Sequence, residues 1–441
     1  MNPIPAVKSW WRAALPERLM VGMLGYGPGN MTPAFIVSFM VYGVITPYLS
    51  ILVHGLGYSL LWVGILLGIF EGAGIAGPFV FGYWADRAGS YRGPLLAANL
   101  LPALAVIPLA LFPRPAVSAL CLALLAFGFR ATTSLLDAVT TIRLGKGGDY
   151  GRVRVTGSIS FIGFALFLQW TPFLKPDGAG NIALWIALTS AASAAPVLLL
   201  SRRMLDGAGS RNAPVRGPPP SRPFRLSLYF VTGFTLIFLC RFSMAAVYTY
   251  FPLYLTRVMN WDAVGLMFAL AAAAEVPVMF VSARFLRRGG ALPLLCLAAC
   301  GISVRLFIWA LFPFRAPVIA AQLLHSLCFG IYHPAAVHFI ATVFPPEKRG
   351  VGMSIYLALG SGLPTLLGNM LGGVVVEAAG YRVLFALFAS VTAAAALAYG
   401  IQRMAELKRQ ARKRRDIEII NTHAARFNRE AEENLVFQDM P

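Results

Sequence analysis

Long apolar segments fill most of the chain, and short polar stretches separate them. Each segment has at least roughly the 20 residues that an α-helix needs to cross the hydrocarbon core of a bilayer. The sequence therefore predicts an all-α membrane protein with twelve membrane-spanning helices. The expected spans are residues 31–53, 61–83, 93–112, 116–142, 155–174, 181–201, 226–256, 263–284, 291–312, 317–344, 351–376 and 379–401.

A polar break divides the twelve segments into two sets of six. Residues 202–225 form the most polar interruption, with several arginines and the run Gly-Pro-Pro-Pro. A weak repeat supports the division, since residues 42–49 of the first span resemble residues 248–255 of the seventh. Duplicated halves around a central site are typical of transporters, so we predict two pseudo-symmetric six-helix bundles. The expected parts are a cytoplasmic segment 1–30, the bundles 31–201 and 226–401, a cytoplasmic linker 202–225 and a cytoplasmic tail 402–441.

The composition excludes two other classes of protein. Of the 441 residues, 58% are hydrophobic and 12% are charged, whereas an ordinary soluble domain has about 25% charged residues. A disordered chain is excluded as well, because disorder requires low hydrophobicity and a high density of charge. The net charge of +19 would suggest nucleic-acid binding in a soluble protein, but its distribution along this chain has another explanation.

Lysine and arginine alternate between the two sides of the predicted spans. Of these 37 residues, 29 lie in the N-terminal segment, the tail and every second loop, five in the other loops and three inside apolar segments. Cytoplasmic loops of membrane proteins carry such an excess of positive charge. We therefore predict a multi-pass protein of the cell (inner) membrane with both termini in the cytoplasm. The basic residues orient the chain in the lipid bilayer, and no nucleic-acid partner is expected.

Neither a metal site nor catalytic machinery stands out in the sequence. The five cysteines lie inside spans, and the pair Cys296 and Cys300 lacks a second pair of ligands. The chain has no G-x-x-x-x-G-K-[ST] phosphate-binding pattern, which argues against direct drive by ATP. We expect no metal, no cofactor and no enzymatic activity. The first 30 residues show no cleavable signal peptide.

A charged motif follows the second span. Its positions are Gly82, Ala85, Asp86, Arg87 and Gly89, and Arg92 follows them. The spacing resembles the loop signature G-x-x-A-D-R-x-G of the major facilitator superfamily, although the two positions after the second glycine are not basic here. The resemblance implies a gating loop that latches one conformation, with Asp137 at the end of the fourth span as a further member. An aspartate in such a loop is stabilised by the N-terminus of a neighbouring helix. The alternative is a short basic loop that only orients the chain.

Three further motifs resemble one branch of this superfamily, which contains phenylpropionate permease and is close to lactose permease and the nucleoside:proton symporters. They are residues 149–158 at the start of the fifth span, residues 324–330 with His333 in the tenth, and residues 345–350 before the eleventh. Because this branch consists mostly of uptake systems, the resemblance implies import.

The resemblance also suggests the proton-coupling residues. Arg305 in the ninth span and His325 in the tenth match a pair that works together in lactose permease. The carboxylate one turn after that histidine is the proton site there, but this chain has Cys328. We therefore expect Glu275 in the eighth span to carry the proton, since a carboxyl group in a low-dielectric cavity binds a proton more readily than one in water. His325 is the alternative carrier, because imidazole titrates near neutral pH.

Ionisable and aromatic residues within the spans are candidates for a solute site. A charge at the centre of a bilayer costs about 2.5–3.5 kcal/mol even on the lenient scale, so such residues are functional candidates by default. The alternative is mutual pairing that only holds helices together. The predicted substrate cavity is lined by Glu71, Arg130, Arg241, Tyr42, Tyr48, Tyr248 and His333. Glycines at four-residue spacing are expected to allow close helix approach, namely Gly64, Gly68, Gly72, Gly368 and Gly372.

These observations predict a secondary transporter that imports a small organic solute together with protons by alternating access. We expect it to act as a monomer. The arginines within the spans suit an organic anion, while neutral sugars and nucleosides are alternative substrates. The lack of a glycine-proline motif between Val155 and Leu174 weighs against drug efflux. The alternative functions are an exporter or lipid-handling antiporter of the same fold, and a sensor that keeps the fold without transport.

Overall fold

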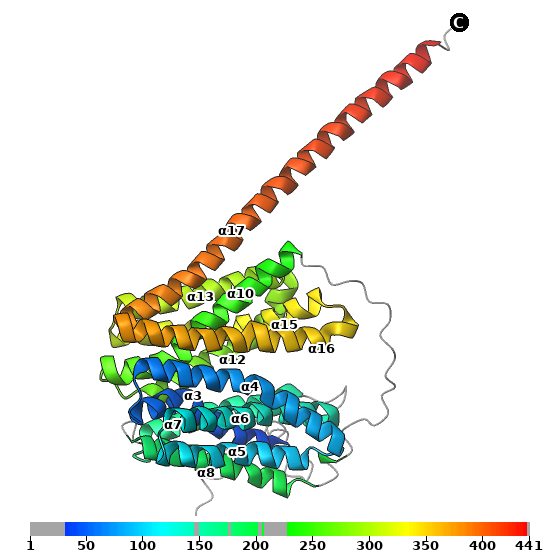
Figure 1. Cartoon of the computed structure of the whole chain (residues 1–441). Helices are drawn as coiled ribbons and strands as arrows, with labels where there is room; N and C mark the ends of the chain where they lie inside the picture. The colour runs from blue at the N-terminus through cyan, green and yellow to red at the C-terminus, as the bar shows by residue number, and fades with distance from the viewer. Residues whose placement is uncertain (1–30, 145–149, 175–177, 202–204, 207–226, 439–441) are drawn as a thin grey trace, which may run out of the picture.

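The computed structural model describes residues 31–144, 150–174, 178–201, 205–206 and 227–438 (Figure 1). The predicted N-terminal segment 1–30 and all of the predicted linker except residues 205–206 lie outside this part of the chain. Nearly every described residue is helical, which confirms the predicted all-α class.

Six long helices form the N-terminal half. They are α3 (Thr32–Gly55), α4 (Leu60–Ala88), α5 (Arg92–Leu111), α6 (Pro115–Leu144), α7 (Tyr150–Trp170) and α8 (Ala179–Leu199). Helices α4 and α7 continue five residues beyond the predicted spans, one at its end and the other at its start. The predicted spans counted only apolar residues, whereas these two helices extend through the charged residues around Asp86 and Arg152.

The C-terminal half is less regular, because π-helical turns interrupt its helices. The elements are α10 (Leu228–Ala245), η2 (Ala246–Tyr250), α11 (Phe251–Leu253), η3 (Tyr254–Val258), α12 (Val264–Gly289), α13 (Ala291–Leu311), α14 (Arg315–Leu323), η4 (Ser326–Ile331), α15 (Tyr332–Val343), the 3-10 turn η5 (Pro346–Lys348), α16 (Arg349–Ile355), η6 (Tyr356–Gly362) and α17 (Leu363–Gln438). Such turns occur frequently at functional sites. Here η2 contains Tyr248 and η4 directly follows His325.

The helices are consistent with twelve spans. Ten helices among the described residues are long and apolar enough to cross a membrane, and the bent helix α12 makes up to eleven. The last of the ten, Arg349–His423, contains Gly380, whose φ of 78° and ψ of 175° are not helical. A positive φ of this size is readily adopted only by glycine. This break separates two helices, with the predicted span 351–376 before it and all but the start of the predicted span 379–401 after it.

The two halves form two helix bundles that lie against each other. Figure 1 shows α3–α8 in one bundle and α10–α17 in the other, with α4 along the first part of α17 at the boundary. A second contact between the bundles joins α7 to α12. The last part of α17 leaves the bundle and projects beyond it (Figure 1).

Glycines allow the backbones of α4 and α17 to come into direct contact. A Cβ atom on Gly64 would lie 2.5 Å from the carbonyl oxygen of Asn369 and 2.9 Å from the Cα atom of Gly373. Cβ atoms on Gly68 and Gly72 would lie 2.8 and 2.7 Å from side chains of α17. The structure therefore confirms the predicted close approach for the glycines of α4, and it occurs at the boundary between the halves.

The glycines of α17 divide between two neighbours. A Cβ atom on Gly368 would lie 2.3 Å from the backbone of α10, and one on Gly372 would lie 2.6 Å from the ring of Tyr250, both within the same bundle. Gly373 faces α4 instead, where a Cβ atom would lie 3.0 Å from the carbonyl oxygen of Leu61. One residue along a helix turns the direction of a side chain by about 100°, which is why neighbouring glycines serve different contacts.

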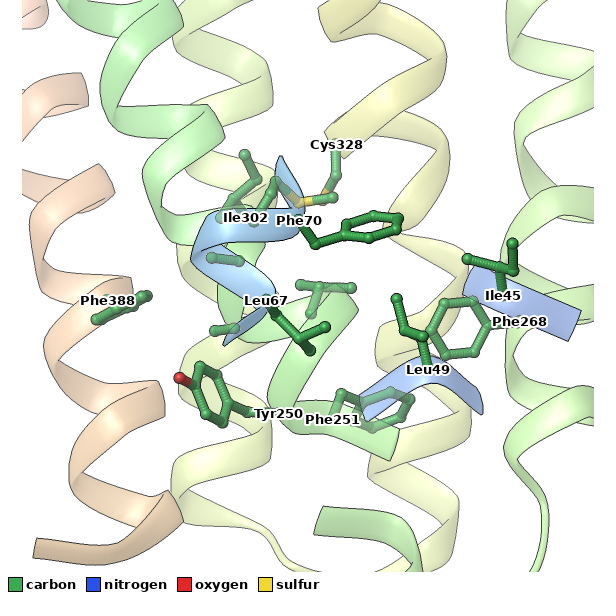
Figure 2. Packing of buried hydrophobic residues seen from close by; sticks show 14 of the residues in the cluster. Ile45, Leu49, Leu67, Phe70, Tyr250, Phe251, Phe268, Ile302, Cys328 and Phe388 are labelled. Atoms are coloured by element: carbon green, nitrogen blue, oxygen red, sulfur yellow. The ribbon is translucent and has the colours of Figure 1, made fainter. Parts of the chain in front are cut away.

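A buried apolar cluster runs across the boundary between the halves. Figure 2 shows Ile45, Leu49 and Leu67 of the N-terminal half in the same cluster as Tyr250 and Phe251 of the C-terminal half. Tyr250 and Phe251 are both 0% exposed. The halves are therefore packed together where these side chains meet.

Candidate functional site

A cavity of about 300 Å³ lies between the two halves. This volume is at the small end of the range for ligand pockets, about 300–1,000 Å³. The wall takes residues from α3, α4, α6 and α7 on one side and from α10, α12, α13 and α17 on the other. A site built by both halves changes shape when the halves move, which is what alternating access requires.

Of the ten residues predicted to line the cavity or to couple protons, eight line this cavity and two lie elsewhere. The lining residues are Tyr42, Glu71, Arg130, Arg241, Tyr248, Glu275, Arg305 and His325. Tyr48 is 1% exposed, and its hydroxyl group lies against Gly265 of α12. The ring of His333 stacks on the ring of Phe329, with 5.5 Å between the ring centroids. Its Nδ1 atom is 3.4 Å from the hydroxyl oxygen of Tyr356. Packing against other helices therefore takes Tyr48 and His333 out of the cavity wall.

The first charged pair on the wall joins α4 to α6. Arg130 Nη2 donates to both carboxylate oxygens of Glu71, at 2.8 and 2.9 Å. The guanidinium also lies over the ring of Phe129, 5.6 Å from its centroid. A glycine brings the two helices together, since a Cβ atom on Gly77 would lie 2.1 Å from the carbonyl oxygen of Phe127. Each charge compensates the other in a region of low dielectric constant.

We expect Arg130→Gln to destabilise the protein, because it leaves the Glu71 carboxylate without its partner. The side chains of Arg130 and Glu71 are 34% and 18% exposed. Water replaces part of the lost interaction, so we expect a loss of about 1–2 kcal/mol. Thermal unfolding of the purified protein in detergent measures this loss. Arg403→Gln is the control, because Arg403 and Glu406 form a pair that is 48% and 42% exposed and contributes little.

The double variant Glu71→Gln/Arg130→Gln separates pairing from other effects. If the two charges stabilise each other, the double variant is more stable than the sum of the single losses implies, because no charge is left unpaired. Strictly additive losses would contradict this role for the pair.

In the second set of charged residues, the His325 ring lies between Arg305 and Glu275. Arg305 Nη1 lies 2.9 Å from His325 Nδ1, and His325 Nε2 lies 3.8 Å from Glu275 Oε2. A guanidinium only donates hydrogen bonds, so Nδ1 accepts and the proton of the neutral imidazole is on Nε2. That proton faces Glu275. His325 can therefore take a further proton only at Nδ1, and that proton would break its hydrogen bond to Arg305.

Arg305 is held rigidly from several sides. It is 1% exposed, and it also donates to the side-chain oxygen of Gln322. The amide nitrogen of Gln322 donates in turn to the carbonyl oxygen of Met267, at 3.0 Å. The guanidinium lies 4.7 Å from the centroid of the Trp309 ring. Gln322 is a site residue that the sequence analysis missed; a polar residue one turn before His325 in an apolar span was the available signal.

A third pair lies at the edge of the cavity. Arg154 of α7 lines the cavity, and its Nε atom is 3.7 Å from Oδ1 of Asp137. Tyr150 donates to the same carboxylate oxygen at 2.7 Å, and the guanidinium lies 4.4 Å from the centroid of the Phe39 ring. The sequence analysis assigned Asp137 to the gating loop, but these partners belong to α7. Arg154 itself was missed, although it lies inside the motif 149–158.

The motif after the second span is largely helical rather than a loop. Helix α4 continues through Gly82, Asp86 and Arg87, and Gly89 ends it with a φ of 63°. This is the left-handed conformation that favours glycine after a helix. Burial, and then the nearby carboxylate of Asp86, raise the pKa of Tyr91. The aspartate therefore lies on the last turn of its own helix, beside the start of α5.

The junction between α4 and α5 is bound to α8 and to Asp206. Arg92 Nη2 donates to the carbonyl oxygen of Leu198 at 3.2 Å, and Ser90 Oγ donates to Oδ1 of Asp206 at 2.5 Å. In the described part of the chain, Asp206 thus contacts this junction, whereas the sequence analysis expected Asp137 to join the gating loop. Asp206 was not considered, because it lies in the predicted linker.

Comparisons with known proteins agree with this architecture. The model of the MFS_1 like family matches residues 30–212 and 222–387. The maltose permease of Geobacillus stearothermophilus is 28% identical over 349 residues, which cover 78% of this chain and 86% of the permease. The probable 3-phenylpropionic acid transporter of Escherichia coli (strain K12) is 26% identical over 360 residues, which cover 80% of this chain and 92% of the transporter.

A solved structure shares the fold. The crystal structure of the nucleoside transporter NupG aligns with a TM-score of 0.69 at 16% identity, covering 84% of this chain and 97% of that one. The relatives are transporters rather than enzymes, and the apolar helices make the chain a multi-pass membrane protein. With a family model that matches most of its length, the chain belongs to the MFS_1 like family of major facilitator transporters.

Proposed function

We propose that the chain is a proton-coupled symporter that imports a small organic solute across the cell membrane by alternating access. The observation that carries this proposal is the row of side chains Arg305, His325 and Glu275 on the wall of the central cavity. In this proposal Glu275 carries the proton and Arg305 is a fixed cation, and both line the cavity that a solute would occupy. A solute in the cavity and a proton at Glu275 then cross the membrane in the same step.

The contacts between the two halves support our proposal that the cavity is closed towards the outside and open towards the cytoplasm. They gather at one end of the bundles, where the backbone nitrogen of Leu61 donates to Glu377 at 3.3 Å and Gln169 Nε2 donates to the carbonyl oxygen of Asp262 at 2.9 Å. The positive-inside pattern puts this end outside the cell and both termini in the cytoplasm. In our proposal the structure is an inward-facing state of a monomer, closed towards the outside.

The proton links the charge of the cavity to the conformation of the halves. With Glu275 ionised, its carboxylate attracts the N–H of His325 Nε2, which is 3.8 Å away. A proton on Glu275 removes that negative charge and weakens the interaction, while Arg305 still holds Nδ1. The protonation state thus biases the contacts of α12, which packs against α7 of the other half. Symport results if solute and proton favour the same change.

Proteoliposomes with an internal pH dye test the proposal without an imposed proton gradient. The solute panel contains aromatic acids, short carboxylates, nucleosides and disaccharides. Acidification of the lumen on addition of one class supports symport. Alkalinisation would instead support an exporter or lipid-handling antiporter of the same fold. If no class causes a pH change and no labelled solute enters, the proposal is wrong and a sensor without transport is favoured.

A further inference from the structure

The charges on the cavity wall do not balance. Four arginines and two glutamates line the cavity among the described residues. Glu71 pairs with Arg130 and Asp137 lies beside Arg154, whereas Glu275 is connected to Arg305 only through His325. Three carboxylates thus face four arginines. Asp137 lies outside the lining but compensates one arginine. Arg241 is the arginine that remains, so the wall carries one uncompensated positive charge.

Arg241 lies on α10 and has no ion-pair partner among the described residues. Its Nε atom is buried and makes no hydrogen bond to any of them. The titratable groups near it include Cys240, Tyr248, Tyr332, His333 and Tyr356. None of these side chains is a carboxylate. A cation at membrane depth is costly unless an anion compensates it, and the anion here has to come from outside the described chain.

The other residues of the cavity wall favour a solute with an apolar body over a solute with many hydroxyl groups. Aromatic rings line the cavity, among them Phe39, Phe70, Phe129 and Phe329. Of the uncharged polar lining residues, Thr249 donates to Asn369 Oδ1 at 2.8 Å and Gln322 accepts from Arg305. The hydroxyl groups left for a solute are few, namely those of Thr46, Ser50, Ser158 and Tyr248. A sugar would leave many hydroxyl groups without partners, whereas a ring would pack against the aromatic side chains.

We propose that Arg241 binds the negative charge of the transported solute, and that the solute class is monoanionic organic acids with an apolar, ring-bearing body. This inference rests on the proposed transport function and deepens it. The planar fork of donors on a guanidinium matches the two oxygens of a carboxylate. The carboxylate compensates the one charge that the protein leaves unpaired, and the ring fills the aromatic part of the cavity.

Tyr248 connects the anion site to the other charged residues. It lines the cavity together with Arg241 of its own half and Arg130 of the other half. Its ring packs edge-on against His325, with 6.3 Å between the ring centroids. An anion at Arg241 therefore lies between the two halves and beside the proton-coupling residues, where it affects both the closure of the cavity and the proton.

Equilibrium binding to the full-length chain in lipid nanodiscs tests this inference. The probes are benzoate, phenylacetate and 3-phenylpropanoate, each with the neutral amide of the same carbon skeleton, and maltose. We expect at least one carboxylate to bind the wild type at least about tenfold more tightly than its amide. Arg241→Gln is expected to remove that preference, and Arg241→Lys to restore part of it because the charge is kept. Arg315→Gln is the control, since Arg315 lies over Trp261 outside the cavity lining.

The outcomes separate this inference from the proposed function, because binding needs no proton gradient. Equal affinity for carboxylates and amides, binding of maltose alone, or no binding of any carboxylate overturns the inference. A carboxylate preference that survives in Arg241→Gln overturns it as well. The unfolding temperatures of the unliganded variants show whether each is folded, and the lysine variant carries the test if the glutamine variant is not. A chain that binds carboxylates through Arg241 but moves no protons contradicts the coupling and leaves the anion site intact.

Discussion

Glu275→Gln is expected to abolish proton-coupled uptake while the protein stays folded. The Glu275 carboxylate lies 3.8 Å from His325 Nε2, which carries the proton of the neutral imidazole. A glutamine of the same shape cannot take up a proton, so the coupled step loses its carrier. Positioned proton-transferring side chains contribute about 100-fold to 10,000-fold to the rates of enzymes, and we expect a comparable loss of at least about 100-fold here.

Two assays on the same proteoliposomes separate coupling from binding. Acidification of the lumen by solute measures coupling, and exchange of labelled for unlabelled solute measures transport without net proton movement. We expect Glu275→Gln to lose the first and keep the second. Glu406→Gln is the matched control, because Glu406 lies exposed on the projecting part of α17. Unchanged acidification in Glu275→Gln would contradict the assignment, and its loss in His325→Gln alone would make the histidine the carrier.

The charged wall of the cavity could be predicted from the sequence because the membrane makes it conspicuous. Glu71, Glu275 and Arg305 stand in apolar spans where a charge is costly, so the pattern alone marks them. Their spans also give their approximate depth. The order of Arg305 before His325 in consecutive spans then suggested their contact, and their ring and guanidinium nitrogen atoms lie 2.9 Å apart.

The side of a helix that faces the cavity was harder to predict. Tyr42 and Tyr48 are six residues apart, which at 3.6 residues per turn puts them on different sides of α3. Only Tyr42 lines the cavity. His333 follows His325 in one row of stacked rings, but the ring of Phe329 lies between them. Counting residues gives depth along a span, whereas the facing side depends on helical phase and on neighbouring helices.

Pairs between different helices could not be predicted from one sequence. Asp137 was assigned to the gating loop from the resemblance, yet its carboxylate binds Tyr150 and lies beside Arg154, both on α7. Asp206 holds the junction before α5 although it lies in the predicted linker. In each case the sequence shows a charged residue near the end of a span, and only the packing of the helices decides which partner it meets.

Gly64→Ala is expected to hold the transporter open at the end that this structure closes. The new methyl group would lie 2.5 Å from the carbonyl oxygen of Asn369 and 2.9 Å from the Cα atom of Gly373. Both atoms belong to the backbone of α17, which cannot move aside like a flexible side chain. Overpacking of this kind costs about 1–3 kcal/mol, and the cost falls only on the state in which α4 and α17 touch. The open state therefore gains roughly tenfold to 100-fold in population, and solute uptake falls by a similar factor because the closed state is needed in each cycle.

Labelling from outside the cell distinguishes this effect from simple destabilisation. A cysteine at Thr46, which lines the cavity, reports access by a maleimide that does not cross membranes, after subtraction of the label taken up by the five native cysteines. We expect Gly64→Ala to increase this labelling strongly. Gly163→Ala is the matched control, since a Cβ atom there would meet no atom within 4 Å. Alanine favours a helix by about 0.5–1 kcal/mol over glycine, so neither variant weakens its own helix. Unchanged labelling in Gly64→Ala would mean that the contact of α4 with α17 does not close the cavity, and the outer gate would then lie at the contact of α7 with α12.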